Sequence, residues 1–182
     1  VARGVARATI ASAWRGLTAR PARQDGVDGT ESLLEAGEVD ATLLAAAGLE
    51  RLGQGHIGVP IPVDVMLPAP GQGAIGIECR SDDHETLSKL TRVSDHQASV
   101  AVKAERAYAR ALGGSCHSPV GAFAEIRDGQ VHLRAEILSE DGKARLADEA
   151  RFKIGDDKAA EALARAMLAK APESIRRLFS AG

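Results

Sequence analysis

The stretch VGAFAEIRDGQVHLRAEIL, from Val120 to Leu138, contains two extended segments separated by Asp128 and Gly129. Asp-Gly is a dipeptide that favours the two-residue turn of a β-hairpin. In the second segment apolar residues alternate with polar ones, which is typical of a strand with one face in water. The apolar set is Val131, Leu133, Ala135 and Ile137, and the polar set is His132, Arg134 and Glu136.

The elements around this hairpin complete a small domain. Asp95 is placed to cap a long helix, and Gly113 and Gly114 are placed to end it. Three antiparallel strands covered by helices would make an α+β domain. The predicted elements are this helix over residues 96–112, a third strand over 143–152, and amphipathic helices over 156–169 and 172–179.

The part of the chain before residue 95 shows shorter patterns. Prolines between Pro60 and Pro70 break it into extended segments. Asp82 can cap a helix through Leu90, with Glu85 at the capping-box position. The other expected elements are a helix over 6–17, a short helix over 30–36, a buried, parallel strand over 39–46, a helical turn over 48–52 and a strand over 74–80.

Composition and charge limit the possible functions. The 182 residues carry a net charge of -2 and are 45% hydrophobic and 26% charged, which is ordinary for a globular protein. No overall positive charge would attract nucleic acid or an anionic membrane. Two cysteines without metal-ligand spacing indicate free thiols in a reducing cytoplasm. The chain begins with Val1 and shows no secretory pattern, so we expect a partial or processed product.

Three stretches together resemble one enzyme family. They are DATLLAAAGLERLG at residues 40–53, LPAPGQGAIGIECR at 67–80, and AERAY at 104–108 followed by LGGSCHSPVG at 112–121. In this order and spacing they are similar to the porphobilinogen deaminases, also called hydroxymethylbilane synthases. The resemblance covers about residues 37–152.

The resemblance implies an α/β plus α+β fold class. Residues 1–70 would be part of the family's second domain, which is of periplasmic-binding-protein type. Residues 71–81 would be the strand that crosses back to the first domain, and residues 82–182 the C-terminal α+β domain with the cofactor cysteine. Most of the first domain, including the family's catalytic aspartate, would be absent.

The resemblance also implies a transferase of tetrapyrrole and haem biosynthesis. The family joins four porphobilinogen molecules head to tail with loss of ammonia, on a dipyrromethane cofactor held by a thioether. The expected partners are porphobilinogen and the growing polypyrrole chain, and we expect neither nucleic acid nor membrane. The protein would act as a cytoplasmic monomer.

Cys116 corresponds to the cofactor cysteine of the family. A thiolate suits this role because it is a soft nucleophile that forms a stable thioether. Without the resemblance, Cys116 would be interpreted as a small buried residue on a tight turn. We interpret Cys79 as a core thiol and His117 as a surface residue rather than a base for Cys116. The remaining histidines show no catalytic or metal spacing: His56, His84, His96 and His132.

The resemblance implies several ligand-binding residues, because the substrate and the cofactor carry acetate and propionate groups. Gly48 would let the ligand approach the backbone closely, and the planar guanidinium of Arg51 would bind a carboxylate. Arg51 could equally be a solvated residue at a helix end. Gln72 would hydrogen-bond across the cleft, or its flanking glycines could serve only a hinge. We expect Arg106 to be a structural ion-pair partner. The full candidate set is Leu44, Ala45, Gly48, Arg51, Gln72 and Arg7.

The sequence departs from the family near its start. Two of the family's substrate-binding arginines fall on Gln24 and Thr30, and only Arg7 matches one of an earlier Arg-Arg pair. Asp25 and Asp28 would repel a carboxylate at this place. We interpret residues before about 33 as the product of a disrupted reading frame or an aberrant gene start.

Three functions are compatible with these observations. The first is hydroxymethylbilane synthesis by a chain that is truncated and poorly active. The second is a non-catalytic small-molecule-binding remnant, and the third is a purely structural fragment. Ammonia release from porphobilinogen separates the enzyme from the binder.

Overall fold

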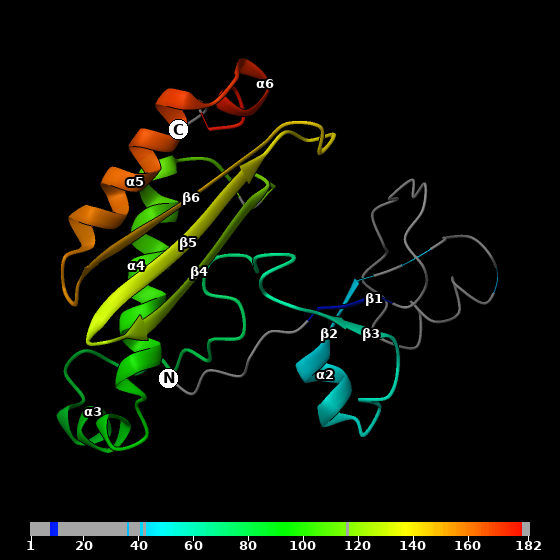
Figure 1. Cartoon of the computed structure of the whole chain (residues 1–182). Helices are drawn as coiled ribbons and strands as arrows, with labels where there is room; N and C mark the ends of the chain where they lie inside the picture. Colours follow the sequence, from blue (N-terminus) through cyan, green and yellow to red (C-terminus); the bar gives the residue numbers. More distant parts are fainter. Residues whose placement is uncertain (1–7, 11–35, 37–40, 42, 116, 180–182) are drawn as a thin grey trace. The chain divides into compact units, whose positions relative to one another are not determined.

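The computed structural model of the chain describes residues 8–10, 36, 41, 43–115 and 117–179 (Figure 1). The chain divides into two compact units, and the main boundary lies between Met66 and Leu67. Each unit contains a three-stranded sheet of its own. The helix expected over residues 30–36 lies outside the described residues, apart from a turn at Ala36.

The C-terminal unit contains the hairpin predicted from the sequence. Strands β4 (Val120–Arg127), β5 (Gln130–Leu138) and β6 (Arg145–Lys153) form an antiparallel sheet in that order. Asp128 and Gly129 have φ values of 51° and 72°, the left-handed backbone that a tight two-residue turn requires. The predicted hairpin and third strand are therefore confirmed.

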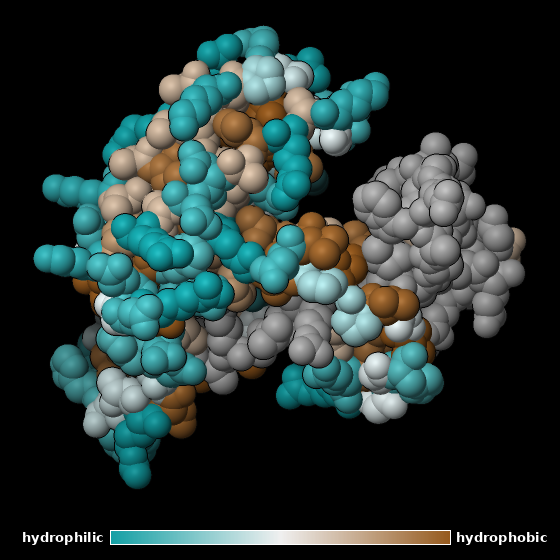
Figure 2. All heavy atoms as spheres, in the orientation of Figure 1, coloured by the Kyte–Doolittle hydropathy of each residue, from teal (hydrophilic) through white to brown (hydrophobic). Residues whose placement is uncertain are grey.

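Helices α4 (His96–Leu112) and α5 (Asp157–Lys170) pack against each other and against the sheet (Figure 1). The short helix α6 (Glu173–Arg176) follows them. Many of the buried positions hold alanine, for example Ala104, Ala107, Ala122 and Ala164, so the elements can approach closely. Tyr108 fills the centre, where its hydroxyl lies 3.3 Å from Sδ of Met167. Figure 2 shows mainly hydrophilic side chains projecting from the visible surface of this unit.

Helix starts in this unit follow side-chain capping. Asp95 precedes α4 as predicted, and its Oδ1 accepts a hydrogen bond of 3.0 Å from the Ala98 N–H. For α3 (His84–Thr91) the cap is Asp83 rather than Asp82, because Asp83 accepts from both the N–H and the hydroxyl of Thr86. Glu85 forms an ion pair of 2.6 Å with Lys89 instead of completing a capping box.

The prediction that one face of the hairpin is wet is wrong for two residues. His132 and Glu136 are only 6% and 5% exposed. Both lie on β5, the central strand, where longer side chains of β6 reach over them. His132 Nε2 lies 3.1 Å from Glu149 Oε2, and the Nε of Arg145 donates to Glu136 over 2.8 Å.

The N-terminal unit differs from the sequence prediction. Strands β1 (Ala8–Ile10), β2 (Leu43–Ala45) and β3 (Val59–Ile61) form an antiparallel sheet in the order β2-β1-β3, and helix α2 (Ala46–Arg51) follows β2. Residues 8–10 were expected to be helical, and the strand over 39–46 was expected to be buried and parallel. Both expectations are wrong, because distant segments supply the pairing that decides these short strands.

The segment over residues 74–80 does not form the predicted strand. It has no regular structure beyond a single bridge at Ala74. Ile75 and Ile77 are 57% and 58% exposed, so its apolar side chains are not packed. A strand needs a neighbour for its backbone groups, and beyond the bridge at Ala74 no described strand pairs with this segment. Among the described helices, none is both long and apolar enough to span a bilayer.

Candidate functional site

The loop that carries Cys116 begins where α4 ends. Gly113 caps the helix with a φ of 67°, and Gly114 follows with a φ of 108°. Residues with a side chain rarely adopt such backbone angles, so the change of chain direction after α4 favours glycine at both positions. Cys116 itself lies outside the described residues, and its neighbours on both sides are described.

Ser118 organises the loop from its far side, and sequence reasoning missed it. Its hydroxyl accepts a hydrogen bond of 3.0 Å from the Ser115 N–H and donates one of 3.1 Å to the Leu178 carbonyl. The backbone adds a bond of 3.0 Å from the Ser118 N–H to the Ser115 carbonyl. Ser115 Oγ also accepts from the His117 N–H over 3.2 Å.

The glycine pair packs against the end of the chain. A Cβ on Gly114 would lie 2.7 Å from Ser118 Oγ and 3.1 Å from the ring of Phe179. A Cβ on Gly113 would lie 3.2 Å from the Phe179 carbonyl. Phe179 is part of the hydrophobic core, so this contact joins the loop to the centre of the unit. Phe179 therefore packs against the start of the loop, whereas Ser115 and His117 are exposed.

Glu105 is a second residue that sequence reasoning did not single out. It lies on α4 and is 1% exposed, yet both carboxylate oxygens accept backbone hydrogen bonds. Oε1 accepts from the Ala124 N–H of β4 at 2.7 Å, and Oε2 accepts from the Gly71 N–H at 2.8 Å. The carboxylate therefore joins α4, the sheet and the Gly-Gln-Gly segment. A charged residue between Ala104 and Ala107 on a buried helix face was the available signal.

Gln72 lies in a tight turn between two glycines. Gly71 and Gly73 both have φ values of 75°, and the Gln72 N–H donates to the Ala69 carbonyl over 3.0 Å. The Gln72 side chain is exposed. Arg106, expected to be an ion-pair partner, is exposed and forms no ion pair with the described residues. Its place one residue beyond Glu105 turns it outward from the buried face of α4.

Four candidate residues fall together in the N-terminal unit. Leu44 and Ala45 end β2, and Gly48 and Arg51 lie on α2, which follows directly. A Cβ built on Gly48 would meet no atom of the described residues within 4 Å. Arg51 is exposed and has no ion-pair partner among the described residues. Gln72 belongs to the other unit, and Arg7 lies outside the described residues.

Other candidates from the sequence have simpler surroundings. Cys79 is a free, half-buried thiol in the irregular segment over residues 74–80. The expectation that it belongs to the packed core is therefore wrong. His56, His84, His96 and His117 are exposed. Within the described residues, no group of three His, Cys, Asp or Glu side chains is arranged to hold a metal ion.

Two family models match consecutive parts of the chain. Residues 22–88 match "Porphobilinogen deaminase, dipyromethane cofactor binding domain", and residues 99–171 match "Porphobilinogen deaminase, C-terminal domain". The first match contains the candidates of α2 and Gln72, and the second contains the loop between α4 and β4. The first match begins at residue 22, so the resemblance extends upstream of residue 33, where we expected it to be lost.

Individual proteins give the same result. The chain is 51% identical over 148 residues to a porphobilinogen deaminase of Sphingopyxis alaskensis, which is 81% of this chain and 46% of that protein. It is 45% identical over 119 residues to one of Geobacillus kaustophilus, which is 64% of this chain and 38% of that protein. The chain therefore spans less than half the length of these curated relatives.

Proposed function

Because this chain belongs to the porphobilinogen deaminase family, we propose that it serves hydroxymethylbilane synthesis, the joining of porphobilinogen units with loss of ammonia. The observation that carries the proposal is the match of residues 99–171 to the family's C-terminal domain. That match includes most of α4, all of β4 and the intervening loop with Cys116. The reaction belongs to tetrapyrrole and haem biosynthesis, with porphobilinogen and the growing polypyrrole chain as partners.

In this proposal Cys116 is the attachment point of the dipyrromethane cofactor. When bound, the cofactor supplies the primer from which the polypyrrole chain extends. The residues around Cys116 suit a bulky covalent group, because Ser115 and His117 are exposed. A slow reaction of the thiol is sufficient, because the thioether has to form only once per molecule.

The short helix α2 fits the acidic groups of such a ligand. Gly48 and Arg51 are three residues apart and therefore share one side of the helix. A Cβ at Gly48 would meet no described atom within 4 Å, which leaves room for a ligand to approach the backbone, and the exposed Arg51 guanidinium would bind a carboxylate through two parallel hydrogen bonds. Leu44 and Ala45 lead into this helix, and the resemblance adds Gln72 and Arg7 to the proposed ligand-binding residues.

The domain division, location and oligomeric state are part of the same proposal. Residues 1–70 belong to a domain of periplasmic-binding type, residues 71–81 to the crossover segment and residues 82–182 to the C-terminal domain. The boundary between Met66 and Leu67 supports the first division. We propose a monomer located in the cytoplasm, a reducing compartment that would preserve the free thiol of Cys79.

A colour test with an acidic aldehyde reagent detects a protein-bound dipyrromethane. We expect the chain to develop colour after incubation with porphobilinogen, and Cys116→Ala to abolish it. Cys79→Ala is the matched control and should retain the colour. The same outcome in both variants would contradict the proposal. Measurement of ammonia distinguishes the alternatives, since bound porphobilinogen without ammonia release would identify a non-catalytic binder.

A further inference from the structure

The sheet of the C-terminal unit has two edges, and only the β4 edge is occupied by other described residues. There the Ala122 N–H donates to the Pro68 carbonyl over 2.9 Å. The Ala124 N–H donates to Glu105 Oε1 over 2.7 Å. At the opposite edge lies β6, which is nine residues long, and none of the described strands pairs with its outer side (Figure 1). We propose that Asp148 blocks this free edge against pairing with the same strand of a second copy of the chain.

A hydrogen bond of Asp148 shows which backbone groups of β6 face the free edge. Asp148 Oδ1 accepts a hydrogen bond of 2.9 Å from the Glu149 N–H, which is therefore directed to this carboxylate and away from β5. In an antiparallel ladder the backbone groups of successive residues point alternately to one side and to the other. The N–H groups of Ala147 and Arg151 therefore also point away from β5. Such a row of open donors is a template for strand addition, and Asp148 occupies the donor in its middle.

The register of the sheet gives the same direction independently. Because the Ala124 N–H points outward from β4, Ala124 and its partner Leu133 form a pair without mutual hydrogen bonds. The backbone groups of Leu133 then bond to β6, where the partner of Leu133 is Ala150. Ala150 thus points inward, and the next residue in the alternation, Glu149, points outward.

Asp148 lies in a row of otherwise apolar side chains. Leu146, Ala150 and Phe152 share its side of β6, and they belong to the hydrophobic core or pack against it. The charge of Asp148 acts on this core, because burial raises the pKa of Tyr108 and the Asp148 carboxylate raises it further. An apolar residue would pack better at this position. A charge in the inward-facing row of an edge strand instead opposes pairing with another chain.

Lys170 orients this carboxylate at the edge. Its Nζ, at the end of α5, lies 3.4 Å from Asp148 Oδ2, whereas Oδ1 accepts the Glu149 N–H. The two side chains are 63% and 37% exposed, so the ion pair contributes little to stability. A strand that paired with β6 would have to displace the carboxylate from the Glu149 N–H, and the loss of this bond opposes association.

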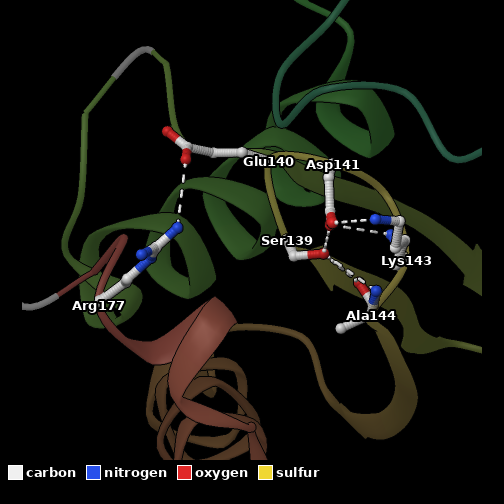
Figure 3. Close-up of polar contacts among 6 residues, drawn as sticks. All are labelled: Ser139, Glu140, Asp141, Lys143, Ala144 and Arg177. Atoms are coloured by element: carbon white, nitrogen blue, oxygen red, sulfur yellow. Dashed lines mark hydrogen bonds and ion pairs between the residues drawn. The ribbon is translucent and has the colours of Figure 1, made fainter.

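The turn before β6 fixes the position of Asp148 along the edge (Figure 3). Ser139 Oγ donates to Asp141 over 2.7 Å and accepts from the Ala144 N–H over 3.0 Å. The Ser139 N–H also donates to the Ala144 carbonyl over 2.9 Å, directly before β6 begins at Arg145. A shift of β6 by one residue would move Asp148 to the other face of the sheet, and these bonds oppose such a shift.

Self-association of Asp148→Val in the full chain tests the proposal. Valine suits both a strand and an apolar row, and it leaves the Glu149 N–H open to a partner strand. We expect the dissociation constant for self-association, measured by sedimentation equilibrium, to fall about tenfold, as for the gain of one or two net hydrogen bonds. Asp82→Val is the matched control, because it adds the same side chain at an exposed position outside the sheet, and it should leave the constant unchanged.

Hydrogen exchange shows whether β6 is the strand that pairs. In Asp148→Val the Ala147 and Arg151 amides should exchange more slowly as the protein concentration is raised, whereas in the unsubstituted chain their exchange should not depend on concentration. An unchanged dissociation constant in folded Asp148→Val would overturn the proposal. Association that leaves these two amides unprotected, or equally strong association of Asp82→Val, would overturn it as well.

A measurement on the unsubstituted chain decides the question if Asp148→Val does not fold. After correction for intrinsic exchange rates, the Glu149 amide should exchange about fivefold more slowly than the Arg151 amide, the effect of one net hydrogen bond. Equal rates would show that Asp148 does not occupy the edge and would refute the proposal. The outcome leaves the proposed function untouched, because no ligand-binding residue of that proposal lies on β6.

Discussion

Glu105 illustrates how one buried charge can organise a whole region. Its carboxylate lies at the free edge of β4, where a neighbouring strand would otherwise form hydrogen bonds, because it accepts a hydrogen bond from the Ala124 N–H. The adjacent Ala122 N–H donates to the Pro68 carbonyl over 2.9 Å, so the residues before Gly71 continue the same edge. A carboxylate accepting two backbone donors satisfies the requirement that a buried charge be well bonded.

We predict that Glu105→Ala lowers the free energy of unfolding by about 3 kcal/mol, because the buried Ala124 N–H and the partly buried Gly71 N–H lose a charged acceptor. Urea denaturation of the full chain measures this change. Glu85→Ala is the control, because its pair with Lys89 is exposed and contributes about 0.5 kcal/mol or less. Equal losses in the two variants would show that the Glu105 bonds contribute little.

Asp141 provides a prediction about pH. The Ser139 hydroxyl, followed by the Lys143 N–H, bonds to its carboxylate and lowers its pKa from 3.8 to about 2. Because the folded state favours the charged form, the turn is stabilised above pH 4 and loses this stabilisation as the pH falls toward 2. An NMR titration of the Asp141 carboxyl should have its midpoint near 2, and Ser139→Ala should move it toward 3.8. A midpoint near 3.8 in the unsubstituted chain would contradict this account.

The two long helices of the C-terminal unit begin in different ways, although aspartate precedes both. Asp95 caps α4 with its side chain, whereas Asp156 before α5 forms no side-chain cap bond. This difference separates the effect of a cap hydrogen bond from that of a nearby negative charge.

We therefore predict that Asp95→Ala destabilises the chain by about 1 kcal/mol and that Asp156→Ala destabilises it by less than half as much. Thermal or urea unfolding of both variants gives the comparison. A larger effect at Asp156 would mean that charge at the helix end, and not the bond to the Ala98 N–H, determines the stability of these helix starts.

Elements differ in how far the sequence predicts them. The hairpin, α4, β6 and α5 follow from local signals: the turn at Asp128-Gly129, the cap at Asp95 and the glycines after Leu112. The strands of the N-terminal unit are three residues long and pair with distant segments, as Ala8 does with Ala45 and Ile61. Local propensity contains little information about such pairings, so these elements were mispredicted.

The same distinction applies to the candidate site across the whole molecule. Sequence motifs indicated Gly48 and Arg51, which share one helix, and the loop after Gly113-Gly114. Ser118 and Glu105 were missed because their roles depend on Leu178 and on Gly71, which are far away in the sequence. Motifs thus indicate candidate ligand-binding residues more readily than residues whose hydrogen bonds connect distant segments.

At the scale of the complete chain, the central claim is that Cys116 bears a covalent pyrrole pair. Trypsin should release residues 111–127 as one peptide, because Arg110 precedes it, Arg127 is its last residue and no Lys or Arg lies between them. After incubation with porphobilinogen, we predict that mass spectrometry shows this peptide heavier by two linked pyrrole units, with the modification at Cys116. An unmodified 111–127 peptide, or a pyrrole bound to Cys79 instead, would contradict the account.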